Sequence, residues 1–360
     1  MKKFITLLVL LQCTSFSYSQ DGGVIPFSSD RWDLKGDSYE IKEIDGQETL
    51  LFKAGKEVPR VILTDANFTN GQISYEVKFD EIRTFLGCYF RMQDLSNYED
   101  FYVRPHQSGN PDAMQYTPVY NALAAWQLYH DDGYATAKAY NYGEWIKISI
   151  LVSGTQAEVY FDDEENPTLF IPHLHREVQA GMIGLWGGVG MFRNFAYKAN
   201  DNMTLKSKGV KKDAMPAGTV TNWFVLPETY TKTQAEGLIK SKNQLNWQSI
   251  KTDAEGRLNV SRVLPPPGEK NTALLKFNIS SETEQTKQID FGFSDRVTIY
   301  VNGQPIYSGN NTYRSRDYRF LGSIGYFDSF YAPLKKGQNE VIFVLSEAFG
   351  GWGAMAKFTN

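Results

Sequence analysis

The sequence predicts an all-β protein made of two β-sandwich (jelly-roll) domains in tandem. Aromatic residues make up 14% of the 360 residues, with 21 Tyr and 23 Phe, and they accompany 30 Gly. Aromatic side chains favour the pleated surface of strands, and glycine favours turns. Short runs of alternating polar and apolar residues recur along the chain, separated by Gly, Asn, Asp and Pro. This spacing is typical of a sandwich.

The chain opens with the features of a secretory signal peptide over residues 1–19. Two lysines precede a short apolar run, and Ser17-Tyr18-Ser19 places small residues before a cut ahead of Gln20. Cys13 offers an alternative, a lipoprotein signal, but the bulky Gln12 stands where that signal needs a small residue. We therefore expect a secreted or periplasmic protein whose mature part begins at Gln20.

Charge and cysteine content narrow the classes of partner. Loss of the two signal lysines takes the formal net charge from −4 to −6, and no basic run follows, which argues against nucleic acid as a partner. Cys88 is then the single cysteine, so no intramolecular disulfide is expected. No segment after the signal is apolar enough for a transmembrane segment.

The first sandwich is expected over residues 20–199. Its strands are expected at residues 72–79, 86–93, 101–106, 125–129, 145–152, 157–161, 181–186 and 192–197. In the first of these strands, apolar residues from Ile73 to Phe79 alternate with polar ones and predict one buried face. Trp126 and Trp145 have apolar neighbours and are expected in the core. The turn at residues 162–167 is rich in acidic side chains, which can bind calcium, so a structural calcium ion there stays an alternative.

Residues 200–218 are polar with clustered lysines, and we expect a linker there. The second sandwich is expected over residues 219–360, with one short helix at 233–241 and strands at 273–279, 287–293, 297–301 and 340–345. Asn302-Gly303, between VTIYV and QPIYS, predicts a hairpin with a type I′ turn. A second aromatic and basic loop in this domain contains Tyr313, Arg314, Arg316 and Tyr318.

Strand alternation places aromatic and polar side chains on a sheet face opposite the core of the first sandwich. The candidate ligand-binding residues on this face are Tyr89, Arg91, Tyr102, Arg104, His106, Gln127 and Tyr129. They alternate with apolar residues such as Cys88, Phe90 and Phe101, which belong inside. Aromatic faces cover the apolar C–H surfaces of sugars, while amide and guanidinium groups meet hydroxyls. The alternative interpretation is a solvated outer face on which arginines stack on tyrosines.

No catalytic or metal-binding signature accompanies these residues. A glycosidase holds two carboxylates across the bond that it breaks, and sandwich glucanases carry theirs in an ExDxxE string on one strand. The string occurs once, at residues 43–48, but Asp45-Gly46 is a turn signal in its middle, so its acids are not expected along one strand. The GxSxG and HExxH strings are missing. His173 and His175 have the spacing of one strand face, but no cysteine pair stands near them. We therefore assign no catalytic residue, no metal ligand and no cofactor.

With these segments in view, residues 28–198 resemble the concanavalin A-like lectin/glucanase superfamily in its laminin-G-like form. The segments that carry the resemblance are FTNGQISYEVKF, LGCYFR, FYVRPHQSGNPDAMQY, WQLY, GEWIKISILVSGTQAEVYFD and GLWGGVGMFRNFAY. The second domain, through FGFSDRVTIYVNGQPIYSG and LKKGQNEVIFVLSEAFGGWGAMAKF, resembles the galactose-binding-domain-like jelly rolls of large glycosidases. The pairing is similar to exported bacterial proteins of Bacteroidetes-type polysaccharide utilisation systems, and this resemblance implies partner enzymes of a glycan-degradation system.

The expected function is that of an exported, non-catalytic carbohydrate-binding protein, a lectin of polysaccharide recognition or utilisation. Arg91 and Arg104 suit an acidic or sulfated polysaccharide or oligosaccharide, because guanidinium matches both groups in bidentate geometry. Two alternatives stay open. One is a glycoside hydrolase or a polysaccharide lyase acting on an acidic glycan, in which Tyr102 or His106 takes a proton. The other is a structural or adhesion module.

Overall fold

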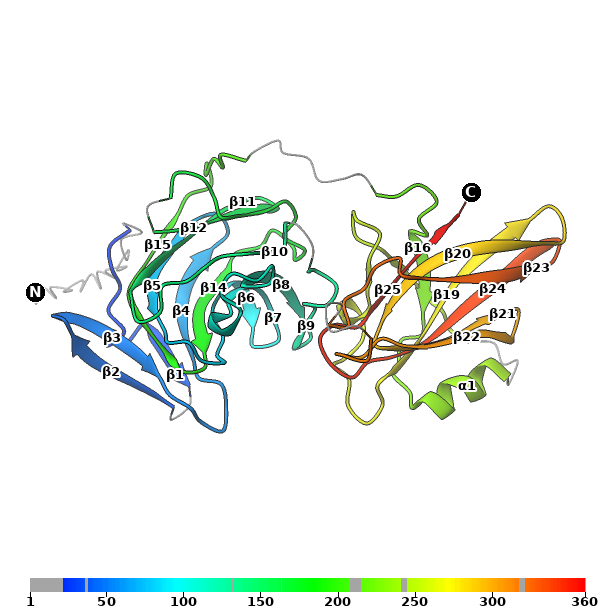
Figure 1. Cartoon of the computed structure of the whole chain (residues 1–360), viewed down its shortest axis with the longest axis horizontal. Helices are drawn as coiled ribbons and strands as arrows, with labels where there is room; N and C mark the ends of the chain where they lie inside the picture. Colours follow the sequence, from blue (N-terminus) through cyan, green and yellow to red (C-terminus); the bar gives the residue numbers. More distant parts are fainter. Residues whose placement is uncertain are drawn as a thin grey trace, which may run out of the picture.

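The computed structural model describes residues 22–35, 38–130, 133–162, 164–207, 215–240, 245–316 and 321–359. Within these residues the protein consists of four antiparallel sheets and one α-helix, α1 (Lys232–Lys240). The sheets form two sandwiches along the long axis of the molecule, the N-terminal one at the left of Figure 1 and the C-terminal one at the right. The predicted all-β class is confirmed, and the signal at residues 1–19 lies outside the described residues.

An eight-stranded sheet and a seven-stranded sheet make up the first sandwich. The larger sheet contains β1 (Trp32–Lys35), β4 (Arg60–Phe68), β6 (Leu86–Asp94), β7 (Asn97–Val103), β8 (Met114–Tyr120), β9 (Leu123–Ala124), β10 (Ala135–Thr136) and β14 (Gly181–Gly187). Its order is β1-β4-β14-β6-β7-β8-β10, with β9 beside β8. The smaller sheet contains β2 (Tyr39–Ile44), β3 (Gln47–Phe52), β5 (Gly71–Lys78), β11 (Ile146–Ser153), β12 (Gln156–Phe161), β13 (Leu169–Ile171) and β15 (Gly190–Ala199). Its order is β13-β12-β11-β5-β15-β3-β2.

The core of this sandwich takes alternate residues from both sheets. Ile73, Tyr75 and Val77 on β5 are buried, as their alternation predicts, and Phe79 follows them into the core. Cys88 and its neighbour on β6, Phe90, enter the same cluster from the other sheet. Each such side chain contributes roughly 1.5–3 kcal/mol by leaving water. The faces of β6 and β7 that turn away from this core are therefore the ones available for a site.

The second sandwich pairs a six-stranded sheet with a four-stranded one. The larger sheet contains β16 (Asn222–Val225), β17 (Gln248–Lys251), β19 (Thr272–Ser281), β21 (Arg296–Val301), β22 (Gln304–Asn310) and β24 (Gly337–Ser346), in the order β17-β16-β19-β24-β21-β22. The smaller sheet contains β18 (Leu258–Asn259), β20 (Gln285–Ser294), β23 (Asp328–Leu334) and β25 (Gly353–Phe358), in the order β18-β25-β20-β23. Helix α1 lays Ala235 against Leu274 and Ile342 on the outside of the larger sheet.

The hairpin predicted in the second sandwich is confirmed, and a tryptophan anchors the core of this domain. Asn302 and Gly303 have φ angles of 51° and 80°, the left-handed pair that a type I′ turn requires, and they join β21 to β22. Trp352 is fully buried, and its Nε1–H donates to the carbonyl of Leu345 at 3.2 Å. Trp352 therefore belongs to the core of this domain.

One expected strand in the first sandwich, at residues 125–129, is wrong, and the strand expected at residues 101–106 ends three residues early. Strand β7 ends at Val103, and the 3₁₀-helix η1 (Pro105–Gln107) follows, because proline has no N–H for the ladder. Residues 125–129 form turns, in which the N–H groups of Leu128 and Tyr129 both donate to the carbonyl of Ala125. Trp126, which stands inside these turns, is half-buried, so its expected place in the core is wrong; Trp145 is half-buried as well.

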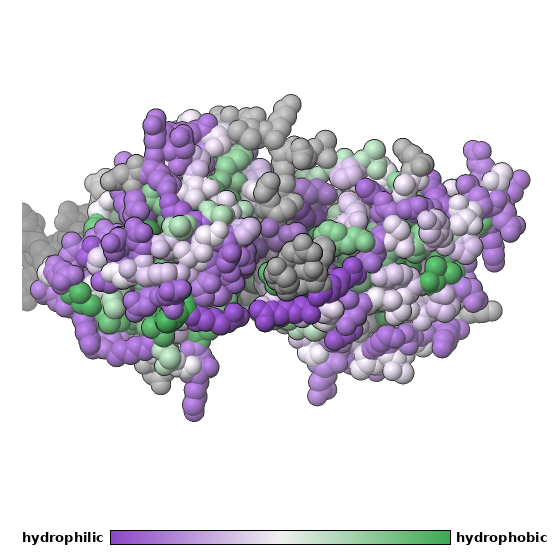
Figure 2. Space-filling view, viewed as in Figure 1, coloured by the Kyte–Doolittle hydropathy of each residue, from purple (hydrophilic) through white to green (hydrophobic). Residues whose placement is uncertain are grey.

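The two sandwiches contact each other through loops beside β9 and β25 (Figure 1). Asn121 donates to the carbonyls of Ser261 at 2.9 Å and Leu264 at 3.2 Å, both in or beside the 3₁₀-helix η2 (Val260–Arg262). His130 Nε2 lies 3.0 Å from the carbonyl oxygen of Ile324. On the face shown in Figure 2 most residues are hydrophilic, and the hydrophobic ones lie in small separate areas. Among the described residues, the helix is too short to span a membrane.

Candidate functional site

A pocket of about 510 Å³ lies where the two sandwiches meet, and we name it the interdomain pocket. The first sandwich lines it with Asp100, Tyr102, Arg104, His106, Trp126 and Trp186, and the second sandwich with Tyr313, Arg314, Ala348 and Phe349. Because both domains supply side chains, the pocket depends on the contact between them.

The base of the pocket is the outer face of the eight-stranded sheet. Asp100 and Tyr102 on β7 alternate with core residues, and they reach Trp186 on the β14 strand. The ring centroids of Tyr102 and Trp186 are 5.8 Å apart, and Tyr89 stacks on Trp186 at 5.6 Å with an interplanar angle of 11°. A continuous aromatic surface results, which favours contact with apolar C–H groups.

Arg104 is fixed at the edge of this surface. Its Nη1 donates to the carbonyl of Asp112 at 2.8 Å, and its Nη2 donates to the hydroxyl of Tyr102 at 2.9 Å and to Gln115 Oε1. Gln115 Nε2 in turn donates to the carbonyl of Trp126 at 2.8 Å. The guanidinium also lies 4.8 Å above the ring of Tyr102. Arg104 is therefore a preorganised cation, with further N–H donors beyond these bonds.

Asp100 is a buried acid in the base of the pocket. Its side chain is 4% exposed, and its Oδ1 accepts a hydrogen bond from Trp186 Nε1 at 2.8 Å. Burial raises the pKa of Asp100 well above its ordinary value, although Trp186 and the charge of Arg104 act in the opposite direction. The surroundings of Asp100 therefore favour its neutral form more than water does.

His106 is held in its neutral form on the rim of the pocket. Its Nδ1 lies 3.2 Å from the carbonyl oxygen of Thr84, which can only accept, so Nδ1 carries the proton and Nε2 keeps its lone pair. Burial lowers the pKa of His106, and the positive charges of Arg83 and Arg104 lower it further. A neutral imidazole at this place can act as a base or as a hydrogen-bond acceptor.

The second sandwich adds aromatic rings on the opposite side. Trp126, Tyr313 and Phe349 meet edge to face, with ring centroids 5.6 to 6.2 Å apart. The loop that carries Phe349 is fixed by Asp295, whose Oδ2 accepts from the N–H groups of Ala348 at 2.6 Å and Phe349 at 2.8 Å. Phe349 remains 59% exposed. Together with Trp126 and Tyr313 it forms a contiguous aromatic patch, and such patches mark binding surfaces.

Four of the seven residues predicted from the sequence lie on or in this site. Tyr102, Arg104 and His106 line the pocket, and Tyr89 packs behind Trp186 on the same sheet face. The face was expected to be open, yet Tyr89 and Tyr102 are both buried.

Arg91 points away from the pocket, and its predicted place on that face is wrong. The pairing of β6 with β7 shifts register after Phe90, and Arg91 has a φ angle of 49°. This bulge adds a residue and reverses the alternation beyond it, so that Met92 joins Tyr89 on the outer face. Arg91 is 1% exposed and donates to the carbonyls of Thr69 at 2.8 Å and Gly154 at 2.6 Å.

Gln127 and Tyr129 connect the domains at positions outside the pocket lining. Gln127 is fully buried, donates from Nε2 to the carbonyl of Leu321 at 2.9 Å, and accepts from Ser294 Oγ at 2.8 Å. Tyr129 packs on His175, with ring centroids 4.1 Å apart. Their expected place on a sheet face is wrong because residues 125–129 form turns.

Sequence reasoning missed Asp100, Trp126, Trp186 and Phe349. Alternation was a usable signal for Asp100, because its neighbour Glu99 points into the core, where its Oε2 accepts from the hydroxyl of Tyr116 at 2.6 Å. Of the second aromatic and basic loop, Tyr313 and Arg314 line the pocket, and Tyr318 lies outside the described residues. The fourth member, Arg316, pairs with Asp328 at 2.6 Å.

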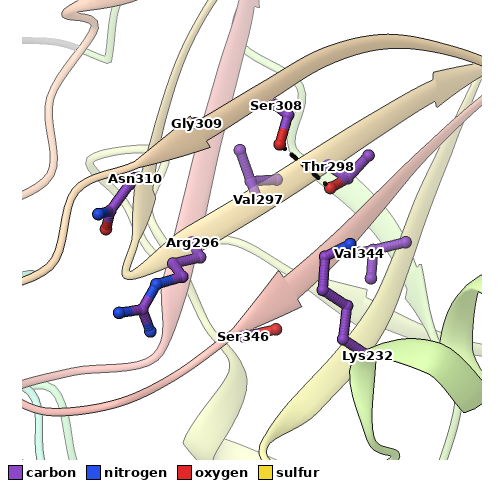
Figure 3. Close-up of a pocket in the computed structure, with 9 residues that line it drawn as sticks. All are labelled: Lys232, Arg296, Val297, Thr298, Ser308, Gly309, Asn310, Val344 and Ser346. Carbon is purple, nitrogen blue, oxygen red and sulfur yellow. Dashed lines mark hydrogen bonds between the residues drawn. The ribbon is translucent and has the colours of Figure 1, made fainter.

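A smaller hollow of about 260 Å³ lies on the second sandwich, beside α1 and strands β21, β22 and β24 (Figure 3). Lys232 and Arg296 supply its positive charge, and Thr298 Oγ1 and Ser308 Oγ lie 3.5 Å apart across two strands. None of its nine lining residues is aromatic. The interdomain pocket is therefore the better candidate for a ligand with apolar faces.

No protein-family model matches the sequence, and no curated protein matches it. The carbohydrate-binding module CBM66 from Bacillus subtilis is similar in structure at 11% identity and a TM-score of 0.33, over 47% of this chain and 92% of that chain. A "putative glycosyl hydrolase" from Parabacteroides distasonis shows 18% identity and a TM-score of 0.31, over 47% and 94%. The exoplasmic/lumenal domain of VIP36, bound to Ca²⁺ and Man3GlcNAc, shows 11% identity and a TM-score of 0.37, and the match covers 54% of this chain and 94% of that chain. Likeness at this level concerns the β-sandwich fold alone.

Proposed function

We propose that the protein binds a carbohydrate that carries acidic groups in the interdomain pocket. The observation that supports this most is the convergence, in one pocket, of aromatic rings from both sandwiches with the fixed guanidinium of Arg104. Aromatic rings cover the C–H faces of a sugar, and a preorganised guanidinium binds a carboxylate or sulfate. The volume of about 510 Å³ lies within the ~300–1,000 Å³ typical of small-ligand sites.

The charge of the pocket supports an anionic sugar over a neutral one. Arg83, Arg104 and Arg314 line it, against the two acids Asp100 and Asp112. Burial raises the pKa of Asp100 well above its ordinary value, which favours its neutral form over a negative charge. The lining is therefore positive on balance, although the chain as a whole has a net charge of −4.

Replacing Trp126 with alanine is expected to weaken binding of the acidic sugar about 10- to 100-fold, since a tryptophan at the centre of a contact carries much of its free energy. Trp145→Ala is the matched control. Trp145 is equally half-buried, lies under Arg193 at 4.0 Å from ring centroid to guanidinium, and does not line the pocket. Calorimetric titration with uronic, sulfated and neutral oligosaccharides measures the affinities. Equal affinities for the two variants would contradict the site.

A second candidate function, a polysaccharide lyase, is supported by His106 and Asp100, which line the same pocket; burial lowers the pKa of His106 and raises that of Asp100. In such a step His106 Nε2 takes the proton from the carbon next to a uronic carboxylate, and Arg104 binds that carboxylate. A C=C bond forms as the glycosidic C–O bond breaks, and Asp100 protonates the leaving oxygen. Each residue lines the same pocket.

Lyase activity would release unsaturated sugars that absorb in the ultraviolet. Replacing His106 with glutamine is then expected to lower this rate about 10²- to 10⁴-fold while sugar affinity changes little. A wild-type protein that binds acidic oligosaccharides without releasing unsaturated or reducing ends has the binding function alone.

Export remains part of this proposal. The composition of residues 1–19 supports a cleaved signal and a secreted or periplasmic protein, with partner enzymes that act on the same glycan. Sequencing the N-terminus of the protein recovered from the producing cells tests the cut ahead of Gln20. A mature chain that still starts at Met1 would contradict it.

A further inference from the structure

A second group of polar side chains lies between the sandwiches, beside Tyr129. It contains His173 and His175, which follow β13 in the first sandwich, and Asp253 and Glu255, in the turn between β17 and β18 of the second. We name these four residues the Asp253 cluster. One possible ligand atom from each of His175, Asp253 and Glu255 lies within 4.8 Å of the others. The three side chains are 8–9% exposed, so the group is nearly closed to solvent.

The turn from Asp253 to Arg257 fixes the orientation of the Asp253 carboxylate. Asp253 Oδ1 accepts from the N–H groups of Glu255 at 3.0 Å and Arg257 at 2.9 Å. Asp253 Oδ2 has no hydrogen-bond partner among the described residues, although the side chain is nine-tenths buried. This oxygen points at His175, whose Nδ1 lies 3.8 Å away, too far for a hydrogen bond. A buried carboxylate oxygen in this position is costly unless a cation binds it.

The ring of His175 is oriented by its neighbours. The hydroxyl of Tyr134 donates to Glu255 Oε1 at 3.1 Å, so at its contact of 2.8 Å with His175 Nε2 it accepts the imidazole proton. His175 Nδ1 then carries a lone pair that faces Asp253 Oδ2. Tyr129 packs against the ring at a tilt of 34°, with centroids 4.1 Å apart, and restricts its rotation. Two electron-pair donors therefore face each other across a buried gap.

We propose that the Asp253 cluster binds a divalent cation of the zinc class and so links the two sandwiches. Its ligands are His175 Nδ1, Asp253 Oδ2 and a carboxylate oxygen of Glu255. Imidazole with carboxylate is a donor set for zinc, whereas calcium and magnesium take oxygen ligands alone. Two ligands of a tetrahedral zinc ion lie roughly 3.4 Å apart, so the observed 3.8 Å needs only a few tenths of an ångström of closure.

The surrounding groups fit this role. His173 Nδ1 lies 2.5 Å from Glu255 Oε1 and orients that carboxylate from outside, as second partners of metal ligands do. The guanidinium of Arg257 lies 5.4 Å over the ring of Tyr129, and its Nη1 is 3.7 Å from Glu255 Oε2. Arg257 offsets one of the two carboxylate charges, so we expect reversible binding.

The test is a titration of the full-length, metal-free protein with Zn²⁺, followed by calorimetry and by thermal unfolding. Zinc at about 100 times its Kd is expected to raise Tm by roughly 5 °C. Asp253→Asn keeps an oxygen for the two backbone N–H groups and removes the charged ligand, so it should weaken zinc binding at least about 10-fold. Glu177→Gln, a loss of one carboxylate that is 71% exposed, should leave zinc binding unchanged.

Three outcomes would overturn the proposal. In the first, zinc leaves the Tm of the wild-type protein unchanged. In the second, Asp253→Asn binds zinc as tightly as the wild type. In the third, stability responds to acid and not to zinc, which would mean that an imidazolium of His175 pairs with Asp253. If Asp253→Asn fails to fold by circular dichroism, His175→Gln replaces it in the same comparison. Because the readouts are zinc binding and Tm, they stand apart from the proposed sugar site.

Discussion

Replacing Gln127 with alanine is expected to cost about 2–4 kcal/mol of stability and to abolish ligand binding. The side chain is fully buried between the domains, where it bonds to Leu321 and Ser294, and its backbone N–H donates to Gly350 at 2.9 Å. A Cβ on Gly350 would come within 2.6 Å of the Gln127 side chain, so the fit leaves no spare room. Truncation therefore leaves buried polar groups without partners and opens a cavity.

Gln93→Ala is the control for this effect. Gln93 donates to the carbonyls of Arg91 at 3.2 Å and Ala180 at 2.9 Å, both inside the first sandwich. Because Gln93 is only half-buried, Gln93→Ala should lower the free energy of unfolding by less than Gln127→Ala does. Sugar affinity should stay the same. Urea unfolding and calorimetry measure the two quantities. A Gln127→Ala protein with unchanged stability and affinity would show that the domain contact does not depend on this residue.

Stability is expected to fall as the pH rises from about 5 to 9, and Glu347 contributes to this fall together with the buried acids Glu99 and Asp100. Burial, with help from the charge of Asp295, raises the pKa of Glu347 from 4.5 to about 8, against the hydrogen bond from Gly351 N–H. Between these two pKa values the folded state binds more protons than the unfolded state. The contribution of Glu347 to the free energy of unfolding therefore falls as the pH rises, and it levels off above about pH 8. The shift corresponds to roughly 5 kcal/mol at most.

Glu347→Gln removes this titration while it keeps the shape of the side chain. The variant should match the wild type near pH 5 and exceed it in Tm at pH 9. Glu99, whose pKa burial raises to about 7, gives a smaller slope of the same sign, so the variant keeps some pH dependence. Thermal unfolding at five pH values measures both curves. Parallel curves for the two proteins would rule out Glu347 as the source.

The sequence was sufficient for the parts of the fold that follow local rules. The alternation in residues 72–79 predicted a strand with one buried face, and Asn302-Gly303 predicted its hairpin. The same rule placed Tyr102 on the outer face of β7, and Arg104 follows directly after the strand ends at Val103. The parity of β7 therefore predicted one residue of the pocket base, whereas Asp100 and Trp186 on the same face were missed.

Where the prediction was wrong, a non-local or irregular feature decided the outcome. The bulge at Arg91 reverses a strand face through one positive φ angle, which no periodicity shows. Trp126 stands in a turn that is shaped by contact with Phe349, more than two hundred residues later. The Asp253 cluster joins His175 to a turn nearly eighty residues away. Such partners meet only through the docking of two domains.

Both sandwiches contribute residues to the interdomain pocket, and this has a practical consequence. Each sandwich has its own hydrophobic core, so a chain cut between β15 and β16 should give two halves that fold separately. Neither half would hold a complete pocket, since one lacks Phe349 and the other lacks Arg104. Sugar binding would then appear only when the halves are mixed and reassociate. Sugar binding by the mixed halves therefore reports their reassociation. Mutations at the contact between the sandwiches can be ranked by how much they reduce this binding.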